Sequence, residues 1–135
     1  MGIIFDYIFW TVTWCGITGL VRYVAEIPPS LQKIDNVKLQ RKQYYQYFTN
    51  LVSLIHAFYA LAICRIDIIA GGYCILFEPH QWNRPLTVLE FQLINSSFCY
   101  FIVDTAVGFI GGYNDFWMNV HHAVMFTSYL NTYYK

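Results

Sequence analysis

The sequence is poor in charged residues. Asp, Glu, Lys and Arg make up 12% of its 135 residues, about half of their share in a typical soluble domain. Hydrophobic residues account for 57% of the chain, and the formal net charge is zero. A neutral chain offers no excess of positive charge to nucleic acid. The composition therefore predicts an integral membrane protein and excludes nucleic acid as a partner.

Cysteine pairs with the spacing of a metal or redox motif are also missing. Cys15, Cys64, Cys74 and Cys99 form no CxxC pattern and lie mostly in apolar runs, where a thiol behaves as a small hydrophobic group. The first ten residues, MGIIFDYIFW, lack the positive segment of a secretory signal and the arginine-rich pattern of a transit peptide. We expect no cleaved targeting segment.

Four apolar runs have the length of a membrane-spanning helix, which needs about 20 residues to cross ~30 Å of hydrocarbon. We expect spans near residues 3–24, 48–70, 92–112 and 116–134. Helices are favoured because lipid offers no hydrogen bonds to an open sheet. The expected fold is all-α, a single polytopic membrane helical bundle of about four transmembrane helices that covers residues 1–135.

The segment between the first two runs combines proline with positive charge. Pro28 and Pro29 are expected to end the first helix. A weakly amphipathic surface helix over residues 30–43 and a solvated connector fit the pattern equally well. The positive-inside rule places this loop in the cytosol or mitochondrial matrix and both chain ends on the opposite side. Four of the eight Lys and Arg residues lie here, at Lys33, Lys38, Arg41 and Lys42.

Glycine pairs are expected to end the second and third helices. The first pair is residues 71–72, and the second closes the run GFIGG at residues 108–112. No strand precedes GFIGG, so close helix packing or a helix stop explains it better than phosphate binding. Residues 73–91 contain two of the four prolines and predict an irregular interfacial loop.

Asp104, His121 and His122 lie in an otherwise apolar stretch over residues 100–126. A rise of 1.5 Å per residue places His56 and Asp104 roughly 12 Å, and the histidine pair roughly 8 Å, below the positive face. An ionised Asp near mid-membrane costs at least ~2.5 kcal/mol, so Asp104 needs a partner, and each of these histidines is a candidate. Because consecutive residues point about 100° apart on a helix, one of His121 and His122 should face it.

Three roles are open for these four residues. A buried Asp–His hydrogen bond can tie helices together, a contact worth about 0.6–2 kcal/mol in membranes. The same groups suit proton transfer, which makes His121, His122, Asp104 and His56 the candidate catalytic residues. They also have acceptable ligand types for a metal, but no HxxxH spacing supports a site. We expect no metal and no cofactor.

Three segments resemble the TLC domain shared by TRAM, longevity-assurance (ceramide synthase) and ceroid-lipofuscinosis membrane proteins. NLVSLIHAFYAL is similar to an early His-bearing helix of that family, SSFCYFIVD to its S-x-x-Y-F-x-x-D helix, and DFWMNVHHAVMF to its D…HH segment. The likeness covers roughly residues 45–130. The matching positions are His56 in the first segment, Ser97, Tyr100, Phe101 and Asp104 in the second, and Asp115, His121 and His122 in the third.

The resemblance implies a polytopic membrane protein that acts on or near lipids. Ceramide synthases transfer a fatty acyl group from acyl-CoA to a sphingoid base, whereas other members influence phospholipid composition or act in cargo transport. After the HH pair the synthases continue with an Asn, Arg and paired-Asp pattern. Here only SYLNTYYK follows, in which Asn131 matches one position and the acidic pair is absent. The chain looks like a shortened TLC domain, which favours a role without catalysis.

We therefore expect a non-catalytic structural and lipid-contacting subunit of a larger membrane complex, such as a mitochondrial respiratory or ATP synthase assembly. Its partners would be membrane lipids and other membrane protein subunits, in the mitochondrial inner membrane or the endoplasmic reticulum. The alternatives are a lipid-modifying, acyltransferase-like enzyme that uses Asp104 and His121 or His122, and a lipid-sensing or trafficking protein. A cavity wide enough for an acyl chain at His121 and Asp104 would favour chemistry, and a packed, dry contact would disfavour it.

Overall fold

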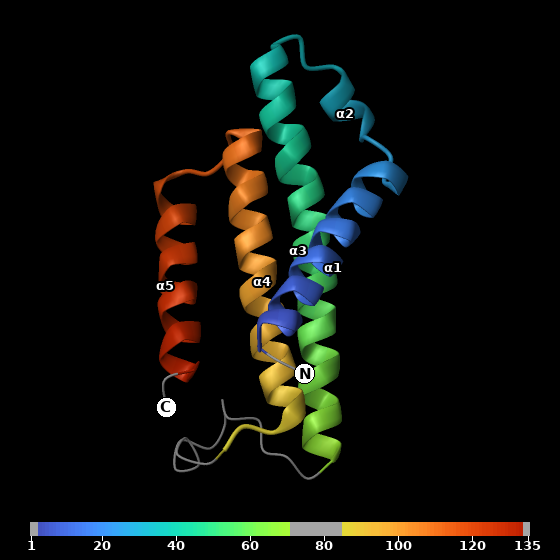
Figure 1. Cartoon of the computed structure of the whole chain (residues 1–135). Helices are drawn as coiled ribbons and strands as arrows, with labels where there is room; N and C mark the ends of the chain where they lie inside the picture. Colours follow the sequence, from blue (N-terminus) through green and yellow to red (C-terminus); the bar gives the residue numbers. More distant parts are fainter. Residues whose placement is uncertain (1–2, 71–84, 134–135) are drawn as a thin grey trace.

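The computed structural model describes residues 3–70 and 85–133, and within these ranges all regular structure is helical (Figure 1). The expected all-α helical bundle is confirmed. The expected helix end at residues 71–72 and most of the loop expected at residues 73–91 lie outside the described ranges. The helices are α1 (Ile3–Val24), α2 (Pro29–Gln32), α3 (Val37–Ile69), α4 (Val88–Gly111) and α5 (Phe116–Tyr133).

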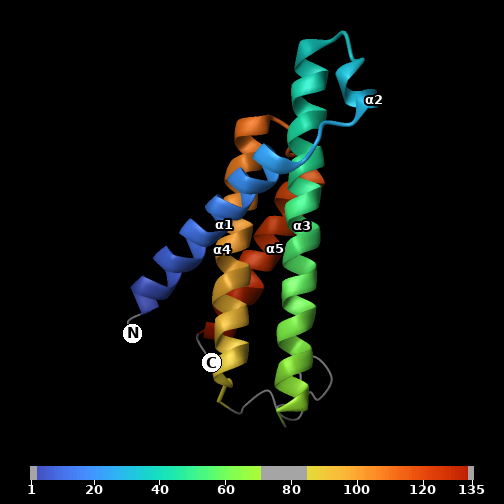
Figure 2. The same cartoon turned by 90° about the vertical axis from the view of Figure 1, so that its right-hand side faces the viewer.

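The bundle is built on three mutually contacting helices. α1, α3 and α4 pack against one another, α2 packs on α3, and α5 packs against α4 alone among the described helices. α1 crosses the others at a slant, and α3 extends beyond the end of α4 on the side where α2 lies (Figures 1 and 2). The start of α1 and the end of α5 lie toward the opposite side (Figure 1). The chain therefore runs up, down, up and down through its four long helices.

Three of these helices, α1, α3 and α4, are long and apolar enough to cross a membrane, by length and composition. The protein is thus of the integral membrane type. At 33 residues, α3 is roughly 50 Å long and exceeds a hydrocarbon core of ~30 Å, so its first turns project past it. α5, over the fourth expected span, is not among these three helices. It contains two histidines and two asparagines within 18 residues.

Two helix boundaries differ from the sequence-based expectation because cap residues set them. The prediction of a single surface helix over residues 30–43 is wrong, because α2 ends at Gln32 and a second helix, α3, begins after Asn36. The Asn36 side chain caps α3 by accepting hydrogen bonds from the backbone N–H groups of Lys38 and Leu39. α3 then runs unbroken into the second span. α4 begins at Val88, four residues earlier than expected, because Thr87 and Glu90 form a capping box.

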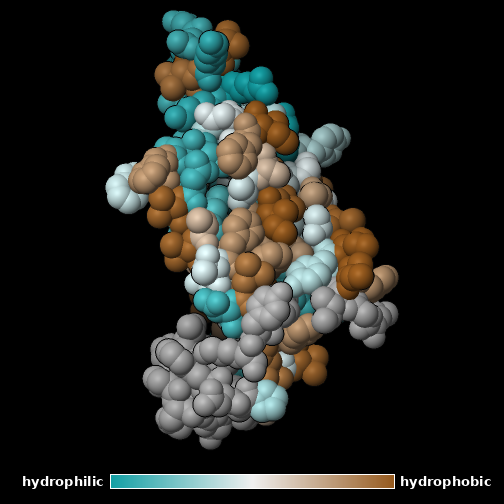
Figure 3. Space-filling model, turned by 60° about the vertical axis from the view of Figure 1, so that its left-hand side comes forward, coloured by the Kyte–Doolittle hydropathy of each residue, from teal (hydrophilic) through white to brown (hydrophobic). Residues whose placement is uncertain are grey.

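The core lies where α1, α3 and α4 meet. Trp14 of α1 is 2% exposed, and its indole N–H donates to the carbonyl of Ser96 at 2.9 Å and lies 3.1 Å from the Ser96 hydroxyl oxygen. Large apolar side chains remain exposed along every long helix, and Figure 3 shows hydrophobic residues over the middle of the molecule and hydrophilic residues at its upper end. That distribution suits a bundle surrounded by lipid. The buried apolar cluster is Trp14, Val52, Cys99, Tyr100, Phe101 and Val103.

The GFIGG run both packs closely and stops a helix. A Cβ atom at Gly111 would lie 2.6 Å from the Cβ of Tyr45 on α3, so only glycine allows this approach. Gly112 ends α4 with φ of 65°, in the left-handed region that glycine adopts freely. Gly108 faces Asn114 in the same way, through a contact that a Cβ would block. The interpretation of this run as close packing and a helix stop is confirmed.

Candidate functional site

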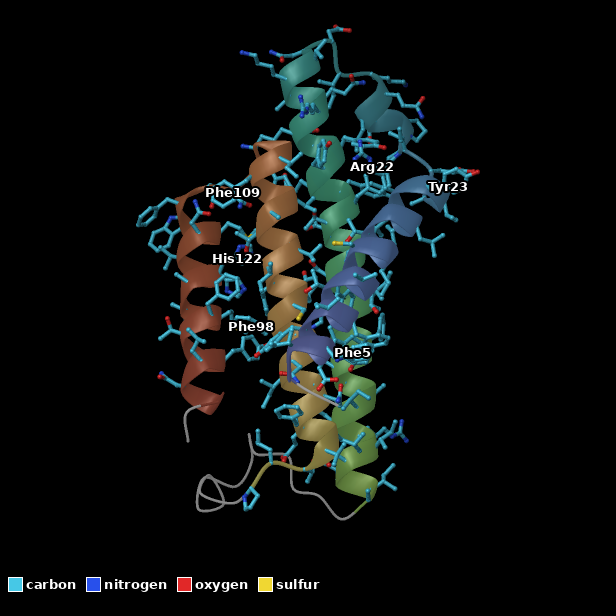
Figure 4. The ribbon with its side chains drawn as sticks, viewed as in Figure 1. Phe5, Arg22, Tyr23, Phe98, Phe109 and His122 are labelled. Carbon is cyan, nitrogen blue, oxygen red and sulfur yellow. The ribbon has the colours of Figure 1, made fainter. Side chains whose placement is uncertain are left out.

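Asp104 of α4 and His122 of α5 form the centre of the candidate site. His122 Nε2 lies 3.0 Å from Asp104 Oδ2, and His122 points from α5 toward α4 (Figure 4). Both side chains are buried, at 9% exposed for Asp104 and 3% for His122. Of the three histidines expected as partners, the structure brings His122 to the carboxylate. This contact joins α5 to the rest of the bundle.

Hydrogen-bond directions show how many protons the pair holds. The Thr105 hydroxyl donates to the carbonyl of Phe101 at 2.6 Å, so its oxygen accepts from His122 Nδ1, 2.9 Å away. His122 Nδ1 therefore carries a proton. A 3.0 Å contact between Nε2 and Oδ2 then needs one further proton, on either atom. The pair is neutral overall in both cases, which lowers the free-energy cost of burying it.

The other two histidines lie apart from this contact. His121 is exposed on α5, and its ring lies 5.9 Å from that of Phe101. His56 of α3 contacts the Ser97 hydroxyl through Nε2 at 2.9 Å and stacks on the Tyr100 ring, with centroids 4.1 Å apart. Only His122 of the adjacent pair faces Asp104, as the helix geometry predicted. His56 does not pair with the carboxylate.

A chain of hydroxyl groups between α3, α4 and the turn before α5 was not expected from the sequence. The Tyr113 hydroxyl donates to Thr49 at 2.6 Å. Ser53 donates to the backbone carbonyl of Thr49 at 2.9 Å, so the Tyr100 hydroxyl donates to Ser53 at 2.7 Å. Burial raises the pKa of Tyr113 to about 12, which keeps this hydroxyl protonated as a donor. The sequence did contain one indication of it, because Thr49 and Ser53 are four residues apart and therefore lie on the same face of a helix.

A polar cavity of about 600 Å³ lies beside the Asp104–His122 pair. The two residues of the pair contribute to its wall, as do His121 and His56. The cavity exists because α5 packs on α4 and leaves α3 at a distance. Its volume falls in the range of roughly 300–1,000 Å³ typical of small-molecule sites. The four candidate residues therefore line one cavity.

A second, mostly apolar cavity of about 400 Å³ continues between the same three helices toward the other end of the bundle. His56 lines both cavities. The apolar cavity is walled by aliphatic residues of α3 and α4 and by Met125 and Tyr129 of α5, with Asp67 among its lining residues. Asp67 is buried and accepts a hydrogen bond from Thr87 at 2.8 Å. Together the cavities form a polar and an apolar compartment that meet at His56.

Within the described ranges, no three His, Cys, Asp or Glu side chains are grouped so that they could hold a metal ion. The Asp104–His122 pair uses one nitrogen for the carboxylate and the other for Thr105. No ring nitrogen of His122 is left to bind a metal. The arrangement suits hydrogen bonding or proton transfer instead.

Comparison with known proteins places the chain in no family: no family model, no curated protein and no solved structure matches it.

Proposed function

We propose that the protein is a non-catalytic structural subunit of a larger membrane complex and that it holds a membrane lipid between α3, α4 and α5. The observation that carries this proposal is the position of α5. This helix packs against α4 alone among the helices described, and many of its side chains are exposed. A helix attached along one side in lipid gains stability when a neighbouring subunit covers its other sides.

The residues on the uncovered surface of α5 support a protein neighbour. Asn119, His121 and Asn131 are exposed beside the exposed apolar residues Val124 and Leu130. Amide and imidazole groups are costly to place in hydrocarbon. Hydrogen bonds to polar groups of a second membrane protein would satisfy them. The mixed surface therefore fits a subunit interface better than bulk lipid.

The two cavities support the lipid. The polar compartment at Asp104 and His121 suits a head group with hydroxyl or amide hydrogens, and the apolar compartment suits part of an acyl chain. His56 lies at the boundary between them. A lipid bound here would also fill the space between α3 and α5 and so stabilise the position of α5.

The resemblance to the TLC domain supports an organellar membrane. The three segments that carry the resemblance lie in α3, in α4 and at the start of α5, which are the helices that line the cavities. We place the protein in the mitochondrial inner membrane, within a respiratory or ATP synthase assembly, or in the endoplasmic reticulum. Lys33 before α3 and the positive residues in the first turns of α3, Lys38, Arg41 and Lys42, favour a matrix or cytosolic side for this end of the bundle.

Site-specific photo-cross-linking in native membranes tests the subunit proposal. A benzophenone amino acid at Val124, 57% exposed on α5, should give one protein adduct of defined mass in nearly quantitative yield. The matched control is Phe58, 67% exposed on α3, where lipid adducts should predominate. Gentle purification of the tagged protein should yield the same neighbour. Lipid adducts alone at Val124, with a lone species on a native gel, would contradict the proposal.

A lipid-modifying enzyme is the second candidate, and the cavity beside the Asp104–His122 pair favours it. A pair that shares one proton could relay it to or from an acyl carbonyl or a hydroxyl group placed in this cavity. Asp104→Asn keeps a hydrogen bond to His122 but removes the carboxylate that accepts the proton. Lipid profiles of cells with Asp104→Asn or His122→Ala would change if the protein were this enzyme. Unchanged profiles in both variants would exclude this function.

A further inference from the structure

Cationic side chains gather at the α2 end of the bundle. A cavity of about 510 Å³ lies between the end of α1, α2 and the first turns of α3. Arg22 and Arg41 line it, together with Tyr44 and Tyr45. Arg22 points from α1 into the region between α2 and α3 (Figure 4).

The two arginines are held in place by aromatic rings. The guanidinium of Arg22 lies 4.9 Å from the centre of the Tyr45 ring and 5.5 Å from that of Tyr44. Arg41 lies 5.8 Å from the Tyr45 ring and donates from Nη2 to the carbonyl of Ile110 at 3.4 Å. Arg22 also makes side-chain hydrogen bonds to Tyr44 and Tyr45, and because a guanidinium has five N–H donors, others remain for a further acceptor. Both charges are thereby oriented before any ligand binds.

No acidic residue offsets these charges at the cavity wall. Arg22 and Arg41 are its charged lining residues, and a second cavity of about 530 Å³ on the other side of Arg41 adds Lys38 and Lys42. The four cations therefore form a positive surface without a compensating carboxylate among its lining residues.

The position and the remaining wall indicate which anion fits. Arg22 lies at the end of the α1 span, the depth at which lipid head groups begin, and tyrosines are typical of that layer. Ile27, Leu31 and Val37 supply an apolar part of the wall. A free phosphate ion would gain nothing from apolar side chains, whereas the glycerol and upper acyl groups of a lipid would contact them.

We infer that this cavity binds the phosphate of an anionic phospholipid, with Arg22 and Arg41 as its charged ligands and the apolar wall against the lipid's glycerol backbone. Guanidinium groups recognise phosphate through paired N–H donors. Basic residues at a membrane surface attract anionic lipids. This site is separate from the α3–α4–α5 cavities and does not depend on the function proposed for them.

Thermal unfolding of the full chain in mild detergent tests the inference. Dioctanoyl phosphatidylglycerol should raise the midpoint in a saturable way. Dioctanoyl phosphatidylcholine and inorganic phosphate at the same concentrations should not. An equal rise with phosphatidylcholine would overturn the inference, and so would an equal rise with inorganic phosphate, since the ligand would then be a free anion.

Variants assign the effect to the site. Arg22→Gln and Arg41→Gln should each raise the half-saturating phosphatidylglycerol concentration about fivefold. The charge-matched control is Arg65→Gln, which removes an exposed arginine near the far end of α3 and should leave the titration unchanged. If Arg22→Gln does not fold, as judged by helical circular dichroism, Arg41→Gln alone decides. The assignment would be contradicted if Arg41→Gln kept the half-saturating concentration of the unchanged protein. It would also be contradicted if Arg65→Gln raised that concentration as much as Arg41→Gln does.

Discussion

Asp104 and His122 show how one ionisable pair can be buried between two packed helices at low cost. Because Thr105 fixes a proton on Nδ1 of His122, the pair shares a single further proton and stays neutral. The apolar run around Asp104 was enough to predict a histidine partner. The choice between His121 and His122 depends on the rotation of α5 about its axis, which neighbouring residues set and which the local pattern does not specify.

A double-mutant cycle measures this contact. Asp104→Ala and His122→Ala should each destabilise the bundle, and their coupling free energy should be about 0.6–2 kcal/mol. His121→Ala is the matched control, because this histidine is exposed, and it should show no coupling to Asp104→Ala. Reversible unfolding in mixed micelles gives the values. Additive effects of Asp104→Ala and His122→Ala would show that the contact contributes nothing.

Gly111 tests the close approach of α4 to α3. Gly111→Ala would place a methyl group within 2.6 Å of the Tyr45 Cβ, so the helices must separate, at a cost of about 1–3 kcal/mol in unfolding free energy. Gly16→Ala on α1 is the control, since no atom lies within 4 Å of its Cβ position and alanine favours helix. Equal unfolding free energies for the two variants would contradict the packing.

Capping residues set the first residues of α3 and α4, which the apolar runs did not predict. Asn36 begins α3 well before its apolar part, and the Thr87–Glu90 box begins α4 before the predicted span. Both are readable signals: an Asn before a helical stretch, and a Thr followed three residues later by Glu. The apolar runs predicted three of the helices, α1, α3 and α4, that are long and apolar enough to cross a membrane. They could not predict where helices begin outside it.

The α4 cap yields a prediction of its own. Thr87→Ala removes the side-chain oxygen that accepts from the Glu90 N–H and donates to Asp67, so it should cost about 1–2 kcal/mol and speed amide hydrogen exchange in the first turn of α4. Thr87→Ser keeps the hydroxyl and should retain most of the protection. Unchanged exchange in Thr87→Ala would show that the cap does not hold this turn.

The attachment of α5 makes it the least stable long helix when the protein is isolated. It contacts α4 alone among the described helices, and few tertiary contacts lead to low local stability. Hydrogen exchange of the purified chain should be faster along α5 than along α4. Rebinding the neighbour found by cross-linking should slow α5 selectively. Equal protection of α4 and α5 in the isolated chain would contradict this ranking.

For the whole molecule, composition and run length predicted an all-α membrane bundle, and the structure confirms that class. The short connection at residues 112–115 makes α4 and α5 antiparallel neighbours. The way in which the helices pack against one another could not be predicted from the sequence, because a helix that is apolar on all sides gives little indication of which face is buried. The buried face of α4 instead carries Asn95, Ser96 and Ser97. Of these, Ser96 accepts from Trp14 of α1 and Ser97 contacts His56 of α3, as polar residues do across helices in lipid.

The proposed function rests on the claim that α5 lies within lipid beside α3 and α4, the two helices of this site long and apolar enough to cross a membrane. Spin labels at Phe58, Ile102 and Val124, one on each helix and all exposed, measure this claim after reconstitution into vesicles. The relaxation of all three should respond to oxygen and hardly to a water-soluble nickel complex, while a label at Lys38 should show the reverse. A response to the nickel complex at Val124 as strong as at Lys38 would place α5 in water and contradict the account.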